Sequence, residues 1–262
     1  NPDLLEALTR SAHWPACDLS HVRFIITGGA PVPLRLIHVY ASRGVSLLQG
    51  YGLSEASPVV LLLDAGSAAG KPGSAGKPVL LVDVRVAGPD GLPCESGETG
   101  ELLVRGPNVM AGYWNLPEDT RQAIDADGWL HTGDAARLDE DGFVWIVDRV
   151  RDRYLSRGRV VYPGDVERVL VGHPGVADAG VVGVPGAGAG VATGAPEDGE
   201  LTGAAFVVRE QGAAVSADDL LELCRRSLAP YQVPVSLTFT EQLPRSSVGK
   251  LLRADLRRLA ER

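Results

Sequence analysis

The chain has 262 residues, of which 45% are apolar and 22% charged, so it is long enough for one large or two modest domains. This composition excludes the collagen-like, coiled-coil and low-complexity classes. The net charge of −8 argues against a general nucleic-acid-binding role, because a surplus of carboxylates repels polyanions. The longest apolar runs, of which 59–63 is one, are too short for a transmembrane helix.

The first 69 residues alternate between helical and extended patterns. Helices are predicted at 3–9 and 33–42, and buried strands at 22–27 and 45–49. This alternation is typical of an α/β layer, in which ligands bind beyond the carboxyl ends of the strands.

The pattern changes after residue 70 to short strands separated by Gly, Pro and Asp turns. Strands are predicted at 80–87, 100–105 and 142–147, with one short helix at 117–124. We therefore expect a small β-barrel-like subdomain over 70–148.

A second alternating region follows, and it predicts a small C-terminal α+β domain over 149–262. Ser216 and Asp219 have the spacing of a helix capping box, and the end of the chain is an Arg-rich amphipathic helix. The predicted helices and strands before that end are 163–171, 176–183, 203–208 and 217–229.

Several features concern the chain as a whole. It begins with Asn1, and its single methionine is Met110, which favours a fragment or a processed product. Three widely spaced cysteines, Cys17, Cys94 and Cys224, favour reduced thiols in the cytoplasm over a disulfide framework or a zinc site.

Two glycine-containing turns follow the first two predicted strands. The first turn is Gly28, Gly29, Ala30 and Pro31, and the second is Gln49, Gly50, Tyr51, Gly52, Leu53, Ser54 and Glu55. Small residues allow a flat ligand to approach the backbone, while an aromatic ring, a hydroxyl and a carboxylate suit a nucleotide with magnesium. The alternatives are a tight turn before a helix and a packed tyrosine followed by a Ser54 helix cap.

Three further groups have charge that suits the same ligand. Asp134 is expected in a turn, where a carboxylate can accept from two ribose hydroxyls, although an Asx turn explains it equally. Lys250 is one of only three lysines and follows a polar loop, yet it can also be an ordinary surface lysine. Five arginines after residue 148 suit phosphates or a solvated hairpin: Arg149, Arg151, Arg153, Arg157 and Arg159.

The order of these motifs resembles the adenylate-forming superfamily of acyl-CoA synthetases, luciferases and peptide-synthetase adenylation domains. The resemblance also includes 97–102, and the segments 104–114 and 128–134 are most similar to a fatty-acid–CoA ligase. It implies that the chain is the C-terminal half of such an enzyme, with the end of a large domain followed by a small mobile one. The loop that grips pyrophosphate in this family precedes the similar region.

The resemblance implies two steps, in which a carboxylate reacts with ATP to give acyl-AMP and coenzyme A then displaces AMP. It implies that Tyr51 stacks on adenine and that Ser54 contacts the α-phosphate. Glu55 is expected to bind Mg²⁺, and Lys250 to approach the reacting groups. The other implied nucleotide- or cofactor-binding residues are Gly28, Gly29, Ala30, Pro31, Gln49, Gly50, Gly52, Asp134, Val147, Arg149 and Gly158, with Arg151 as the hinge.

The implied partners are a carboxylic acid, most simply a fatty acid, and coenzyme A. The family often has two adjacent glycines after the hinge, where this chain has Arg157 and Gly158. Two alternatives stay open: a nucleotide-binding module without turnover, and an adenylating enzyme that loads a carrier protein.

Overall fold

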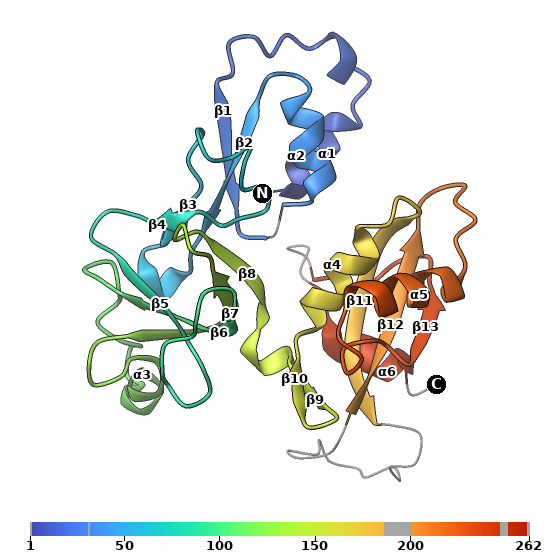
Figure 1. Ribbon diagram of the computed structural model, residues 1–262. Helices are drawn as coiled ribbons and strands as arrows, with labels where there is room; N and C mark the ends of the chain where they lie inside the picture. The colour runs from blue at the N-terminus through green and yellow to red at the C-terminus, as the bar shows by residue number, and fades with distance from the viewer. Residues whose placement is uncertain (1, 31, 186–200, 247–250, 261–262) are drawn as a thin grey trace. The chain divides into compact units, whose positions relative to one another are not determined.

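The computed structural model describes residues 2–30, 32–185, 201–246 and 251–260 (Figure 1). The chain divides into two compact units, Asn1–Ile146 and Val147–Arg262. The domain boundary predicted after residue 148 lies two residues beyond this division, and the domain assignment itself stays a prediction. Each unit is described by itself below.

The N-terminal unit opens with a small α/β layer. Its elements are α1 (Pro2–Thr9), the 3₁₀ turn η1 (Trp14–Ala16), β1 (Phe24–Gly28), α2 (Leu34–Ala41) and β2 (Ser46–Tyr51). β1 and β2 are parallel, as the strand–helix–strand pattern predicts. α2 buries Leu36 and Tyr40 against Leu47, and the Tyr40 hydroxyl donates to the Leu5 carbonyl at 3.0 Å. This core fixes the ends of both strands.

The same unit contains a second sheet. The remaining elements are η2 (Ser54–Ala56), β3 (Leu61–Leu62), β4 (Lys77–Pro78), β5 (Asp83–Ala87), β6 (Thr99–Arg105), α3 (Pro117–Ala123), β7 (Leu130–Leu138) and β8 (Val144–Arg149), whose last residues belong to the second unit. β3 and β4 extend the first sheet, and β5 to β8 form a four-stranded sheet in that order.

The prediction of a barrel-like subdomain is wrong for the part of this unit that the structure describes. β5 and β8 are the two ends of a linear strand order, so the sheet is open. Its apolar residues Val86, Leu102 and Leu130 pack with Val60 and Leu61. This contact buries the apolar face without closing the sheet on itself.

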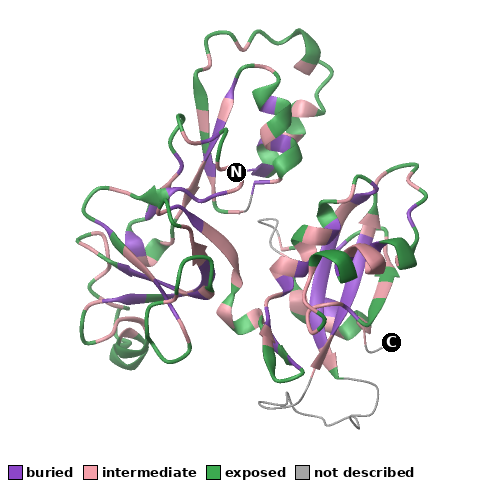
Figure 2. Ribbon diagram, in the orientation of Figure 1, coloured by how far each residue is buried: buried purple, intermediate pink, exposed green. Residues whose placement is uncertain are grey.

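The C-terminal unit is a three-stranded sheet with helices on both faces. Its elements are η3 (Val150–Asp152), β9 (Tyr154–Ser156), β10 (Arg159–Val161), α4 (Pro163–Val171), β11 (Val176–Pro185), β12 (Leu201–Arg209), α5 (Ala217–Ser227), β13 (Ser236–Phe239) and α6 (Arg253–Ala260). β12 lies between an antiparallel β11 and a parallel β13, and the purple strands in Figure 2 are its buried centre.

Alternation along β11 explains both layers of this unit. Val181 faces a core that includes Leu170 of α4 and Leu220 of α5, whereas Val182 faces Leu256 of α6. The predicted capping box at Ser216 is confirmed, because its side chain accepts from the Asp219 backbone and the Asp219 side chain accepts in return.

The sequence also predicted reduced cysteines and no transmembrane helix. The three cysteines are free, and Cys224 is buried. Among the described residues, every helix is too short or too polar to span a bilayer.

Candidate functional site

The carboxyl ends of β1 and β2 bring the two glycine-containing turns side by side. Gly28 pairs with Gly50 in the parallel register. A Cβ atom at Gly28 would lie 2.6 Å from the Gly50 carbonyl oxygen, and one at Gly52 would lie 1.5 Å from the Pro58 carbonyl oxygen. Because backbone atoms cannot rotate away as a side chain can, both positions require glycine.

The backbone beyond β1 is open to a ligand. Gly29 has φ +85°, and no atom lies within 4 Å of where its Cβ would stand. The Val32 backbone amide donates to Gln49 Oε1 at 3.2 Å and so links the two turns. Ala30 is half-buried beside them, while Pro31 lies outside the described residues. This bare backbone fits the flat ring that the sequence predicts for the site.

Tyr51 and Asp134 meet although they belong to different sheets. The Tyr51 hydroxyl donates to Asp134 Oδ2 at 2.6 Å, and Asp134 is only 7% exposed. The sequence assigned both residues to a nucleotide separately, and their contact was not predicted. A carboxylate beside an aromatic ring presents acceptor oxygens next to a flat apolar surface, which suits a ribose joined to a base.

Asp134 lies in a bulge of β7, and the prediction of a turn is therefore wrong. The β6–β7 register shifts between Glu101 and Leu103, and Gly133 has φ +68°. The Thr132 hydroxyl donates to the Leu102 carbonyl at 2.7 Å and accepts from the Asp134 amide at 3.1 Å. Bulges re-aim a side chain without ending a strand, so this one orients Asp134.

Ser54 and Glu55 begin the turn η2. Ser54 is exposed and does not cap this turn, so the Ser54 cap in the alternative interpretation is wrong. The packed tyrosine in that alternative is present, because Tyr51 packs against the apolar core of the unit. Glu55 Oε1 accepts from the Tyr113 hydroxyl at 2.9 Å, and the Glu55 carbonyl accepts from the Met110 amide at 2.8 Å. Burial and then this hydrogen bond raise the pKa of Tyr113, which therefore stays a donor at neutral pH.

Tyr113 is the site residue that the sequence interpretation missed. It lies within 104–114, a segment that the sequence analysis used only for its similarity to fatty-acid–CoA ligases. Its hydrogen-bond partner Glu55 is 58 residues away in the sequence. Glu55 is the carboxylate expected to bind magnesium. The described residues contain no group of three potential metal ligands. One carboxylate fits Mg²⁺ as that ion occurs in phosphate complexes, where waters and phosphate oxygens supply most of the coordination.

The remaining predicted site residues belong to the C-terminal unit. Val147 is half-buried in β8, Arg149 is exposed at its end, and Arg151 is exposed in η3. The Arg149 amide donates to Asp148 Oδ1 at 2.7 Å. Lys250 lies outside the described residues, so its placement is not described.

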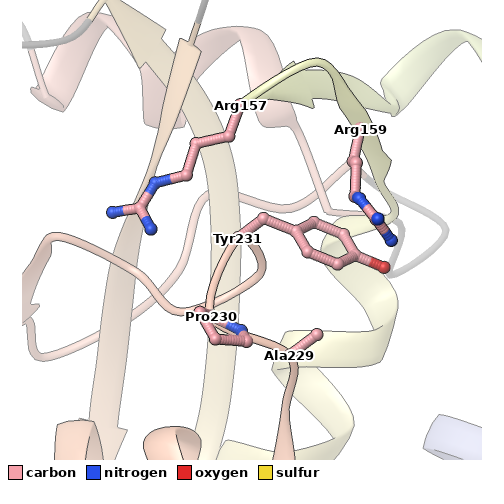
Figure 3. A pocket seen from close by; sticks show the side chains of 5 residues that line it. All are labelled: Arg157, Arg159, Ala229, Pro230 and Tyr231. Atoms are coloured by element: carbon pink, nitrogen blue, oxygen red, sulfur yellow. The ribbon is translucent and has the colours of Figure 1, made fainter.

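Gly158 forms a two-residue turn with Arg157 between β9 and β10. Both residues have positive φ, at +69° and +52°, as a tight hairpin of primed type requires. The hairpin borders a hollow of about 380 Å³. It is lined by Arg157, Arg159, Ala229, Pro230 and Tyr231 (Figure 3).

The hollow has a cationic and aromatic lining. The Arg159 guanidinium lies 5.4 Å from the centroid of the Tyr231 ring, and Figure 3 shows the two arginines on opposite sides of that ring. The described lining contains no acidic side chain. Guanidinium groups beside an aromatic face suit an anion attached to a ring.

Comparison with known families places the chain. The AMP-binding enzyme family matches residues 1–114, and the AMP-binding enzyme C-terminal domain matches 165–250. The chain belongs to the AMP-binding, adenylate-forming superfamily. The first match contains the glycine turns that follow β1 and β2, and the second runs from residue 165 in α4 to Lys250.

Two curated relatives of the chain are a CoA synthase and a CoA ligase by name. A feruloyl-CoA synthase from Amycolatopsis is 45% identical over 98% of this chain and 50% of its own length. A long-chain-fatty-acid–CoA ligase from Mycobacterium tuberculosis is 38% identical over 98% of this chain and 48% of its own. The chain thus spans about half the length of the curated relatives it matches.

Solved structures of the superfamily have the same fold. An O-succinylbenzoate coenzyme A synthetase from Bacillus subtilis, in complex with ATP and magnesium ion, is 35% identical with a TM-score of 0.75 over 97% of this chain and 49% of its own. An amide bond synthetase from Marinactinospora thermotolerans is 32% identical with a TM-score of 0.87 over 99% and 51%.

Proposed function

We propose that the protein carrying this chain is an ATP-dependent ligase that joins a carboxylic acid to coenzyme A. In the first step a carboxylate oxygen attacks the α-phosphorus of ATP, and pyrophosphate leaves with the electron pair of the broken bond. In the second step the thiol of coenzyme A, having lost its proton, attacks the acyl carbon and AMP leaves. The observation that supports this proposal best is the contact between Tyr51 and Asp134 beside the glycine turns.

The N-terminal unit is proposed to bind the adenylate. Gly29 leaves backbone uncovered, and Gly28, Gly50 and Gly52 keep the two turns close to neighbouring backbone. Adenine can therefore lie against these turns with Ala30, Gln49 and the Tyr51 ring. The bulge in β7 places the Asp134 carboxylate beside the Tyr51 ring. With adenine on that ring, the carboxylate can accept hydrogen bonds from the ribose hydroxyls. Ser54, exposed at the start of η2, donates to the α-phosphate.

Charge is handled by Glu55, Arg149 and Lys250 in this proposal. Tyr113 fixes one oxygen of Glu55, which leaves the other for Mg²⁺. A bound magnesium ion neutralises phosphate charge. Lys250 supplies a cation where negative charge develops on the α-phosphate, and Arg149 adds a guanidinium near the ribose. Val147 is proposed to contact the nucleotide. Arg151 is proposed as the hinge on which the small C-terminal domain rotates between the two half-reactions.

Two classes of carboxylic acid are candidates for the substrate. The motif resemblance favours a fatty acid, whereas 45% identity to a feruloyl-CoA synthase favours a hydroxycinnamic acid. We keep the fatty acid as the proposed substrate class and include aromatic acids in its test. A panel of long-chain, hydroxycinnamic and succinylbenzoic acids, assayed by ATP-dependent pyrophosphate release, ranks them directly.

The acceptor is tested in the same assay. Coenzyme A, a pantetheine-loaded carrier protein and a simple amine are supplied in parallel to pre-formed acyl-AMP, and AMP release is measured. Release that requires coenzyme A supports the proposal. Release only with the carrier protein or the amine contradicts it, and nucleotide binding without any turnover supports the binding-module alternative.

We further propose that the hollow beside Gly158 takes the phosphate-bearing end of coenzyme A. Two arginines can form charge-assisted hydrogen bonds to phosphate, and the Tyr231 ring offers a face to adenine. Arg157, where relatives often have a second glycine, is in this proposal an added phosphate contact rather than a defect.

Arg159→Ala tests this part of the proposal. We expect KM for coenzyme A to rise about tenfold, since a hydrogen bond to a charged group contributes about 1.5–3 kcal/mol. KM for pantetheine, which lacks the phosphates, and the adenylation rate should not change. The control is Arg226→Ala, which removes an exposed arginine of α5 that pairs with Glu222. An equal rise in KM for pantetheine would contradict the proposed contact.

A further inference from the structure

A single arginine holds a buried charged cluster in the C-terminal unit. Arg253 is the first residue of α6, and its side chain is 11% exposed. Its Nη2 lies 3.1 Å from Asp148 Oδ1, and its Nε lies 3.5 Å from Asp152 Oδ2. Its Nη1 donates to Glu167 Oε1. Three carboxylates, from β8, η3 and α4, therefore share one guanidinium.

Backbone groups complete the cluster. Gly164 donates its amide to Asp148 Oδ2 at 2.7 Å, and Val181 donates its amide to Glu167 Oε1 at 2.8 Å. Arg253 Nη1 also donates to the Val181 carbonyl at 2.8 Å. Burial raises the pKa of Asp148 and of Glu167, while the charge of Arg253 opposes that rise. The network thus joins β8, η3, α4, β11 and α6.

A gain in folding stability does not by itself explain this buried charged cluster. Buried ion pairs contribute little more than well-packed apolar groups of the same volume, and their best-attested use is to fix how elements align. Here the aligned elements contain, or are close in sequence to, three of the predicted site residues. Asp148 and Asp152 bracket the segment that contains Arg149 and Arg151, and Arg253 follows Lys250 by three residues.

The chain on either side of the Lys250 segment is also fixed in place. Leu251 bridges to Arg245, and the Leu252 amide donates to the Pro244 carbonyl at 2.9 Å. Arg245 Nη2 donates to Asp178 Oδ2 of β11 at 2.6 Å. The described residues that precede and follow 247–250 are therefore held to one another and to β11.

We propose that Arg253 is a positioning residue for adenylation, which holds the start of α6 against the 148–152 segment and so fixes Leu251 and Leu252, the residues that follow Lys250 in the sequence. The inference rests on the proposed role of Lys250. The planar fork of arginine serves three carboxylates and a carbonyl at once, whereas one lysine ammonium cannot reach all of them.

Arg253→Lys tests this inference. We expect the adenylation rate to fall about 10- to 100-fold, since small displacements of a reacting group have effects of this size. KM for ATP and thioester formation from synthetic acyl-AMP should be preserved. In hydrogen exchange on the chain itself, the Leu252 amide should lose protection, whereas the Asp219 amide of the α5 capping box should keep it.

Two further variants sharpen the test. Arg258→Lys changes an arginine of the same helix whose pair with Asp255 is exposed, and it should leave both half-reactions unchanged. Asp152→Asn removes one of the three carboxylates without leaving an unpaired charge, so it should fold and slow adenylation in the same direction as Arg253→Lys, but less.

Two results would overturn the inference. One is an equal loss in both half-reactions for Arg253→Lys, which indicates general destabilisation, and the other is unchanged protection of the Leu252 amide. A wild-type protein that makes no acyl-adenylate would contradict the proposed function instead. The exchange measurement decides about Arg253 in that case, because it needs no turnover.

Discussion

Lys250→Ala should lower the rate of acyl-adenylate formation by about 100- to 1,000-fold, the usual loss when one preorganised charge at a reacting oxyanion is removed. Attack on ATP concentrates negative charge on the α-phosphate, and the proposed lysine offsets it there. In the proposed second step the thiol attacks the acyl carbon and not the phosphorus, so thioester formation from synthetic acyl-AMP should change far less. The two half-reactions are measured separately, by pyrophosphate release and by thioester yield.

The scarcity of lysine supplies a matched control for this variant. Lys77 is exposed in β4, and its Nζ lies 4.5 Å from the centroid of the Phe143 ring. Lys77→Ala removes the same charge elsewhere and should leave adenylation unchanged. If Lys250→Ala slows both half-reactions by the same factor, the lysine has no specific role in adenylation.

Gly52→Ala should abolish nucleotide binding by the N-terminal unit. The added methyl would lie 1.5 Å from the Pro58 carbonyl oxygen, so the turn between Tyr51 and Pro58 must open. Opening it moves Tyr51 away from Asp134 and displaces Ser54 from the start of η2. We also expect the unit to lose at least about 1–3 kcal/mol of stability, as overpacked sites generally do. Calorimetry with AMP and a thermal unfolding scan measure both effects.

The control for Gly52→Ala is Gly70→Ala, in the same unit. Its nearest neighbour would be the Ser67 carbonyl oxygen at 3.8 Å, an ordinary van der Waals contact. This variant should keep its affinity for AMP and its unfolding temperature. Wild-type affinity in Gly52→Ala would show that the turn is not part of the nucleotide site.

Local patterns predicted the C-terminal unit well. The helix predicted at 163–171 is α4, because a proline at its first position and an apolar stripe are local signals. The Ser216 capping box is equally local. By contrast, β13 was not predicted. Its four residues alternate between exposed and half-buried positions, and only pairing with β12 identifies them as a strand.

Long-range contacts explain what the sequence could not show. Tyr51 and Asp134 were separate ligand candidates, and nothing local reveals a hydrogen bond across 83 positions. Arg253 looked like one more polar residue of an Arg-rich helix, but its contact with Asp148 crosses 105 positions. The barrel-like expectation failed for a related reason, since strand patterns do not reveal whether the ends of a sheet meet.

The central claim is that the N-terminal unit binds an adenylate at Tyr51 and Asp134, and one titration tests it most directly. The chain is titrated in a calorimeter with a non-hydrolysable acyl-adenylate analogue, alongside Asp134→Asn and the exposed-turn control Asp127→Ala. We expect one saturable site whose affinity falls about tenfold or more in Asp134→Asn, the loss of a charge-assisted hydrogen bond, and is unchanged in Asp127→Ala. No saturable binding, or equal affinity in all three proteins, would contradict the claim.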